Sequence, residues 1–141
     1  MSKVKIVKQY IKDLSFEVPK APEVFLKQVS KPHINVAINI DAKKFSEDKD
    51  QSSYEVTLKI KADAENKELF ICEVEYAGIF IINNIAQEEL EQILLIYCPN
   101  LLFPFVRKII ASNTIESGFS PLLLDPIDFA DLYKKRKKTV N

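Results

Sequence analysis

The side chains that could carry out chemistry are few in this chain of 141 residues and do not form a recognisable motif. His33 is the single histidine and stands just before an alternating, strand-like segment. Cys72 and Cys98 form no CxxC pair, so we expect two reduced, buried thiols in a cytoplasmic protein. Nucleophilic catalysis requires a base beside the nucleophile, and a metal centre requires clustered ligands. The sequence therefore predicts no catalytic residue and no metal site.

Two carboxylates and two glycines are the remaining groups whose spacing could indicate chemistry. Glu73 and Glu75 alternate along one predicted strand, which places them on one face roughly 7 Å apart. That spacing suits an acid–base pair, but exposed sheet faces commonly carry such residues, and an acidic docking patch is the better interpretation. Gly78 and Gly118 are the only glycines, so no glycine-rich loop can hold a phosphate, and no cofactor is expected.

Composition excludes several classes of protein. Lys plus Arg equals Asp plus Glu at 20 each, and 47% of the residues are hydrophobic, as in a soluble globular domain. No uninterrupted apolar run reaches about 18 residues, and the N-terminus lacks a signal-peptide core, so we expect no membrane insertion. The basic run 134–138 could contact nucleic acid or acidic lipid, but it lacks interleaved aromatic residues. A solvated C-terminus is the simpler interpretation, and no nucleic-acid partner is expected.

Alternation of apolar and polar residues predicts an antiparallel sheet over residues 4–82. The alternating segments are 4–18, 34–41, 54–63 and 70–82. In the first of them, Val4, Ile6, Tyr10, Leu14 and Phe16 share one parity. Pro19 and Pro22 end that strand and begin an ordered, extended crossover. The charged segment 43–53 predicts an exposed hairpin loop, and the short connections predict a meander.

Helical spacing replaces alternation over residues 87–117. Within this region the nine residues 97–105, YCPNLLFPF, contain two prolines and predict a hydrophobic joint between two helices. Gly118 is placed to cap the second helix, and Asp128 to begin a short last helix over 127–136, before a basic tail at 137–141. The fold class predicted is α+β: a single domain, 1–141, with a four-stranded antiparallel sheet and helices packed on one face.

The apolar surface of the helical region exceeds what one small domain can bury. This surplus predicts a symmetric oligomer with the joint and the following helix at a subunit interface. The interface residues expected on this basis are Leu102, Phe103, Phe105, Val106 and Ile109.

Three motifs follow one another along the chain. They are YIKDLSFEVP at 10–19 with Ala-Pro and Val-Phe soon after, FICEV at 70–74 running into Gly-Ile-Phe at 78–80, and YCPNLLFP at 97–104 with Arg107. Together they resemble the SecB family of protein-export chaperones, and the resemblance covers about 7–133.

The resemblance implies a function and a set of site residues. It implies an ATP-independent, cytoplasmic homotetramer, a dimer of dimers, that holds non-native precursor proteins and delivers them to the SecA ATPase. The residues at positions matching the SecA-docking face are Asp13, Glu17, Ile71 and Glu73. Those matching the client-binding groove are Tyr10, Phe70 and Tyr133. The alternative for each of them is a partly buried core residue.

Two departures from the family pattern bear on binding. Val29 stands where many members carry an aromatic residue, so one groove wall is expected to be thinner. The net charge is near zero rather than strongly negative, which predicts a weaker or more salt-sensitive SecA interaction. Two alternatives are a related chaperone of a toxin–antitoxin pair, whose docking acids usually diverge, and a small α+β enzyme.

Overall fold

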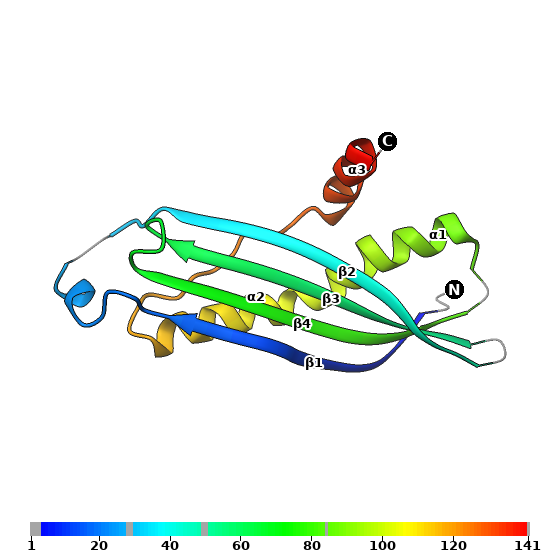
Figure 1. The fold of residues 1–141 in the computed structure, drawn as a ribbon, viewed down its shortest axis with the longest axis horizontal. Coiled ribbons are helices and arrows are strands. Elements are labelled where there is room, and N and C mark those ends of the chain that lie inside the picture. Colours follow the sequence, from blue (N-terminus) through cyan, green and yellow to red (C-terminus); the bar gives the residue numbers. More distant parts are fainter. Residues whose placement is uncertain (1–3, 28–29, 49–50, 84, 141) are drawn as a thin grey trace.

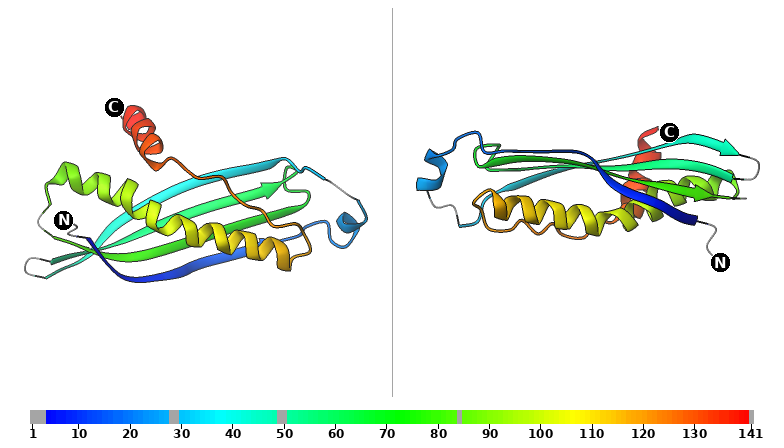
Figure 2. Two further views of the ribbon diagram at one scale, coloured as in Figure 1. Left: turned by 180° about the vertical axis from the view of Figure 1, so that it is seen from behind. Right: turned by 90° about the horizontal axis from the view of Figure 1, so that it is seen from below.

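A long antiparallel sheet with one oblique helix across it dominates the computed structural model, which describes residues 4–27, 30–48, 51–83 and 85–140 (Figures 1 and 2). Within these residues the strands are β1 (Val4–Glu17), β2 (Ile34–Asp48), β3 (Gln51–Ala64) and β4 (Phe70–Ile82). The helices are α1 (Gln87–Gln92), α2 (Cys98–Glu116) and α3 (Phe129–Val140). The predicted α+β fold class is confirmed.

The spatial order of the strands is β1-β4-β3-β2, and every neighbouring pair is antiparallel. Strands β2, β3 and β4 form the predicted meander, and the segment after β1 crosses from one sheet edge to the other. This crossover contains a 3₁₀ turn, Glu23–Leu26, in which Val24 is buried, so the extended conformation predicted there is wrong. Val29 lies outside the described residues.

The hairpin between β2 and β3 is longer than predicted. Instead of an exposed loop over 43–53, β2 continues to Asp48 and β3 begins at Gln51, with one irregularity near Phe45. Lys43 pairs directly with Glu55, and oppositely charged cross-strand pairs stabilise a sheet. Charged residues are also tolerated on an edge strand such as β2, because it faces solvent. High charge therefore indicated exposure here, not a loop.

Two β-bulges interrupt the pairing of β1 with β4, at Val7 and at Lys12. Each bulge adds one unpaired residue and so reverses which side chains face the helix. Tyr10 consequently pairs with Ala77 on the face away from α2, whereas Leu14 pairs with Val74 on the helix-covered face. The face predicted to be shared by Val4, Ile6, Tyr10, Leu14 and Phe16 is therefore wrong for Tyr10 alone, because the second bulge returns Leu14 and Phe16 to the helix-covered face.

The predicted joint at 97–105 is absent, because one continuous helical run links α1 to α2 (Figure 2). A π-helical segment, Ile93–Tyr97, precedes Pro99, and the Cys98 N–H donates to the Ile93 carbonyl five residues back. Single π turns, with hydrogen bonds between residues five apart, occur within otherwise regular α-helices. Since proline has no N–H to satisfy, this turn accommodates Pro99 without ending the helix.

Both predicted end signals of the helices are present. Gly118 has φ +92°, and its N–H donates to the Ile115 carbonyl while the Phe119 N–H donates to the Thr114 carbonyl. These two bonds form a Schellman cap, which favours glycine because of the positive φ. Asp128 caps α3 by accepting the Asp131 N–H at 3.0 Å. The last helix is longer than the predicted 127–136 and includes most of the expected basic tail.

The core lies between α2 and the helix-covered face of the sheet. Leu102, Val106 and Ile110 of α2 are fully buried there, opposite Phe80 and Val74 of β4. At Gly78 the helix comes so close that an added Cβ would lie 3.1 Å from Leu102 Cδ2. Leu102, Phe103 and Val106, three of the five predicted interface residues, are thus covered by their own chain.

The helical run Gln87–Glu116 is long and apolar enough, by length and composition, to cross a membrane, since its most apolar stretch of 18 residues has a mean hydropathy of 1.6. A core helix of a soluble protein meets the same criterion, and this helix packs on the sheet through its fully buried residues. Only 33% of that most apolar stretch is buried within the described chain. The helix therefore leaves apolar surface that its own sheet does not cover.

Candidate functional site

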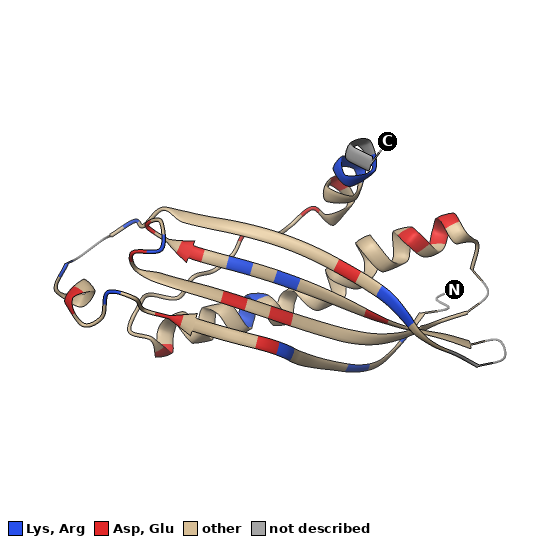
Figure 3. Ribbon diagram, viewed as in Figure 1, with Lys and Arg blue, Asp and Glu red and all other residues tan. Residues whose placement is uncertain are grey.

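Charged residues are spread along the strands (Figure 3), and the pairing register places most of their side chains on the sheet face turned away from α2, which we call the open face. Strand alternation and the pairing register assign its residues. On β1 and β4 these include Lys8, Tyr10, Asp13, Ser15, Glu17, Ile71, Glu73, Glu75, Ala77 and Ile79; on β3 they include Glu55, Thr57, Lys59, Lys61 and Asp63, and on β2 Asp41, which pairs with Thr57.

One end of the open face, which we call the acidic end, contains the four residues predicted to dock SecA. Along β1 and β4, Asp13 is opposite Glu75, Ser15 is opposite Glu73, and Glu17 is opposite Ile71. Directly opposed residues lie on the same side of a sheet, with Cβ atoms about 4.5–5.5 Å apart. The structure thus brings Asp13, Glu17, Ile71 and Glu73 together on one accessible surface.

Lysines of β3 flank these carboxylates. Lys61 is opposite Glu73 and Lys59 is opposite Glu75, and the Lys59 Nζ lies 3.9 Å from a Glu73 carboxylate oxygen. Both side chains of that pair are more than a third exposed. An exposed ion pair of this kind contributes little free energy, about 0–1 kcal/mol. Glu73 therefore remains able to exchange Lys59 for a cation of a binding partner.

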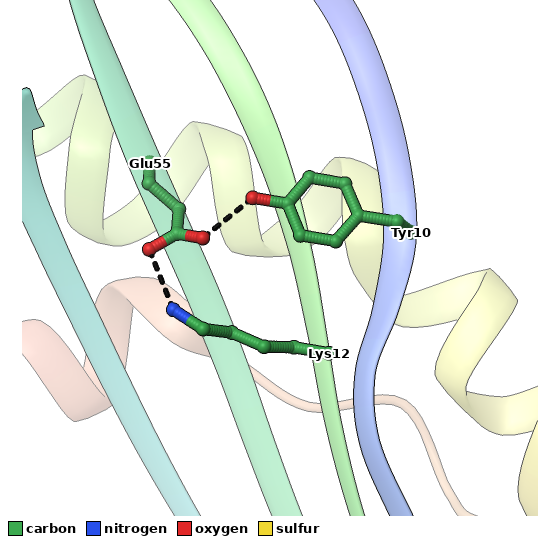
Figure 4. Close-up of polar contacts among 3 residues, drawn as sticks. All are labelled: Tyr10, Lys12 and Glu55. Atoms are coloured by element: carbon green, nitrogen blue, oxygen red, sulfur yellow. Dashed lines mark hydrogen bonds and ion pairs between the residues drawn. The ribbon is translucent and has the colours of Figure 1, made fainter.

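A second cluster, which we call the brace, lies next to the acidic end and was not predicted. Tyr10 extends from β1 across β4 to β3, where its O–H donates to Glu55, and Lys12 Nζ binds the other Glu55 oxygen at 2.8 Å (Figure 4). Ala77, which pairs with Tyr10, is fully buried although it belongs to the open face. Glu55 is distant in sequence from both partners, so only the strand register could have indicated the contact.

Each member of the brace has an altered pKa. Burial, followed by the hydrogen bond to Glu55, raises the pKa of Tyr10 to about 12. The hydrogen bond from Lys12, followed by that from Tyr10, lowers the pKa of Glu55, and the same Glu55 contact raises the pKa of Lys12. Glu55 and Lys12 are therefore held in their charged forms near neutral pH.

The three residues predicted for the client groove do not lie together within one chain. Tyr10 is on the open face, whereas Phe70 is buried on the helix-covered face and stacks on Phe16 with ring centroids 5.2 Å apart. Tyr133 is a buried residue of α3, and its O–H donates to Glu91 at 2.9 Å. Within the described chain they therefore form three separate sites.

Sequence reasoning missed an aromatic cluster beneath the crossover. Phe119 lies 5.2 Å from Phe70 on one side and 5.2 Å from Phe25 on the other, measured between ring centroids. Phe25 is 46% exposed, so the cluster runs from the core to the surface. The cap at Gly118 positions Phe119, so this glycine was the one feature of the sequence that could have indicated the cluster.

A strip of exposed apolar side chains runs along the free edge of β1 and the adjacent side of α2. Ile11, Leu14 and Phe105 are 47%, 37% and 46% exposed, and they line one groove together with Ile109. Phe105 also stacks on Tyr76 with ring centroids 5.9 Å apart. Of the predicted interface residues, Phe105 and Ile109 are thus the two at this surface.

The cysteines are both buried and unpaired, as predicted. Burial raises the pKa of Cys72 to about 11 and that of Cys98 to about 12, so neither is a thiolate at neutral pH. Among the described residues, no three His, Cys, Asp or Glu side chains are grouped to hold a metal ion.

An open charged sheet face and an exposed apolar strip at a sheet edge are features of a protein that binds other polypeptides. The family model described as preprotein translocase subunit SecB matches residues 1–140. The chain belongs to the SecB family of soluble protein-export chaperones, which are not enzymes.

Curated relatives agree with this assignment. The chain is 47% identical over 132 residues to a protein-export protein SecB of Rhodopseudomonas palustris, covering 92% of this chain and 81% of that protein. A second, from Parvibaculum lavamentivorans, is 42% identical over 135 residues and covers 94% and 78% of the two chains. These relatives favour protein export over the alternative of a toxin–antitoxin chaperone.

Solved structures support the fold. A SecB-like chaperone of Mycobacterium tuberculosis, in complex with a peptide from an antitoxin, has a TM-score of 0.69 at 16% identity and covers 89% of this chain and 88% of its own. A protein of unknown function from Streptococcus agalactiae has a TM-score of 0.54 at 12% identity, over 87% and 97% of the two chains. At these identities the likeness concerns the fold.

Proposed function

We propose that this SecB-family protein acts in the cytoplasm as a homotetramer, a dimer of dimers, that holds non-native precursor proteins and delivers them to SecA. The observation that carries the proposal is the acidic end of the open face. Two strands distant in sequence place Asp13, Glu17, Ile71 and Glu73 on one accessible surface. No ATP is consumed by the chaperone in this scheme.

The chemistry of the acidic end suits a basic polypeptide partner. Carboxylates from β1 and β4 line up beside Ile71, which is half-buried and offers apolar contact within the charged surface. Complementary charge accelerates encounter and selects partners, while apolar contact contributes to the lifetime of the complex. Because Lys59 and Lys61 stand on the neighbouring strand, the attraction is short-ranged and sensitive to salt.

The proposed assembly rests on surface that the chain leaves uncovered. β1 is an edge strand, and Ile11 and Leu14 on it form an apolar strip with Phe105 and Ile109 of α2. A long, exposed edge with apolar side chains is normally covered by another chain. A second copy of this chain offers the matching strip, as a two-fold symmetric interface requires.

Client binding is proposed for the aromatic surfaces. Phe25 and Leu26 at the crossover are 46% and 86% exposed, and Phe25 continues inward through Phe119 to Phe70. Such a surface binds apolar segments of unfolded chains with little sequence preference. Tyr10 and Tyr133 contribute to client binding only if assembly joins their surfaces to this one.

Isothermal titration with purified SecA tests the docking surface. Asp13→Asn and Glu73→Gln are each expected to weaken binding by about tenfold at low salt, since each removes one charge from a charge-assisted contact. Glu116→Gln is the matched control, because it removes one exposed carboxylate at the end of α2. Wild-type affinity should fall on raising the salt concentration, and equal losses in all three variants would contradict a localised docking face.

Assembly and client holding need separate measurements. Light scattering should give the mass of four chains, and a stable monomer would contradict the proposed assembly. The chaperone, added at no more than an equimolar amount, should delay aggregation of a denatured precursor without ATP. Failure to do so would contradict the client-holding role.

A further inference from the structure

The brace lies beside the acidic end but belongs neither to the docking residues nor to the core. It links β1 to β3 over the top of β4, through Tyr10, Lys12 and Glu55 (Figure 4). Such a contact spans two strand spacings, roughly 10 Å, so it is not a routine pairing of neighbouring strands. Its position next to Asp13 suggests a role in docking.

Glu55 is the shielded member of the brace. Its side chain is 13% exposed, whereas that of Lys12 is 42% exposed. A carboxylate shielded to this extent needs hydrogen-bond partners to remain charged. Tyr10 and Lys12 supply one donor to each of its two oxygens, so the contact fixes where the Lys12 ammonium lies.

Lys12 has two further carboxylates within electrostatic reach. It is the extra residue of the β1 bulge and immediately precedes Asp13, which pairs with Glu75. Glu75 and Asp41 both interact electrostatically with Lys12, in addition to Glu55. A lysine side chain is long and flexible, so without Glu55 its ammonium would turn toward the nearest remaining carboxylates.

We propose that Glu55 is a positioning residue for the docking face: it holds the Lys12 ammonium over β3 and keeps it from neutralising Asp13 and Glu75. The inference rests on the proposed SecA docking and assigns a role to a residue outside the docking set. Glu55 does not touch the partner. It sets the charge that the partner meets.

The expected effect follows from displacing one cation. If Lys12 pairs with Glu75, the acidic end loses one unit of net negative charge at a few ångströms from Asp13. At effective dielectric constants between those of a protein surface and of water, this weakens attraction of a basic partner by about threefold to tenfold.

A double-mutant cycle measured by titration with SecA tests the role. Glu55→Gln keeps the shape of the side chain but removes the negative charge that pairs with the ammonium, and it is expected to weaken SecA binding about threefold to tenfold. In a Lys12→Met background there is no cation to displace, so the same substitution should then change affinity by less than about twofold. Equal weakening in both backgrounds would overturn the proposal, because Glu55 would then act through strand structure. No weakening in either would overturn it as well.

Zero-length carbodiimide cross-linking with mass spectrometry reads the position of Lys12 without SecA. Wild type should give a Lys12–Glu55 amide, and Glu55→Gln should give a Lys12–Glu75 amide instead. Equal Lys12–Glu75 cross-linking in both proteins would overturn the positioning role. If wild type does not bind SecA at all, the proposed function fails. If wild type binds but the cycle shows no coupling, the positioning role alone fails.

Discussion

Replacing Leu102 by alanine distinguishes the core of one chain from the contacts between chains. Leu102 is fully buried under β4, with its Cδ2 atom 3.1 Å from the position that a Cβ on Gly78 would occupy. Leu→Ala changes in protein cores cost about 2–5 kcal/mol, and more where the surroundings cannot collapse. Here the neighbours are the β4 backbone and the buried ring of Phe80, which are rigid. We therefore expect a loss of about 3–5 kcal/mol per chain.

The assay is urea unfolding followed by circular dichroism, with light scattering on the same samples. The stability of an oligomer depends on protein concentration, so the free energy of unfolding must be compared at several concentrations. We expect Leu102→Ala to lower that free energy while folded protein keeps the mass of the wild-type assembly.

Phe105→Ala is the matched comparison on the same helix. Phe105 is 46% exposed and stacks on Tyr76, so within one chain its loss removes an aromatic pair of about 0.5–1.5 kcal/mol and part of a half-buried ring. If the proposed interface is right, this variant should lose mass in light scattering before it unfolds. The core placement of Leu102 would be refuted if Leu102→Ala separated the subunits without lowering chain stability, or cost less than about 1 kcal/mol.

Two further predictions concern backbone and pH. Gly78→Ala would put a Cβ 2.8 Å from Phe80 Cε1 and is expected to destabilise by about 1–3 kcal/mol, whereas a stabilising effect in urea unfolding would contradict the close helix approach. The lowered pKa of Glu55 gives stability that is present above its ordinary value of 4.5 and lost as pH falls through the lower folded value. The raised pKa of Tyr10 gives stability that is present below 10.0 and lost as pH rises toward about 12. In free energies of unfolding measured across pH, Glu55→Gln should flatten the acid limb and Tyr10→Phe the alkaline limb; unchanged limbs would contradict the brace.

The elements of the fold could be predicted where a local rule was sufficient. Alternation located all the described strands, and the caps at Gly118 and Asp128 followed from the chemistry of one residue each. The errors arose where tertiary structure outweighed the local signal. Two prolines predicted a break at 97–105. The helix continues instead, because a π turn before Pro99 accommodates a residue without an N–H, and the buried face of α2 packs on the sheet.

The candidate site was predictable only in part. The identities of Asp13, Glu17, Ile71 and Glu73 came from resemblance to a family, since carboxylates on a strand do not by themselves indicate docking. The contribution of Glu55 depends on the register of three strands, which the sequence does not state. The separation of Tyr10 from Phe70 likewise follows from the bulges in β1 and not from residue type.

The bulge at Lys12 explains how the acidic end exists at all. Tyr10 lies on the open face. Without the bulge, strict alternation from Tyr10 would place Asp13 and Glu17 on the face beneath the helix and turn Phe16 outward. Burying two carboxylates against α2 without partners would cost several kcal/mol. One extra residue at Lys12 reverses the pattern, so that Phe16 packs on Phe70 while Asp13 and Glu17 face solvent. Because Lys12 is both the residue that creates this reversal and the cation that binds Glu55, the geometry of the proposed docking face and its charge depend on the same position in β1.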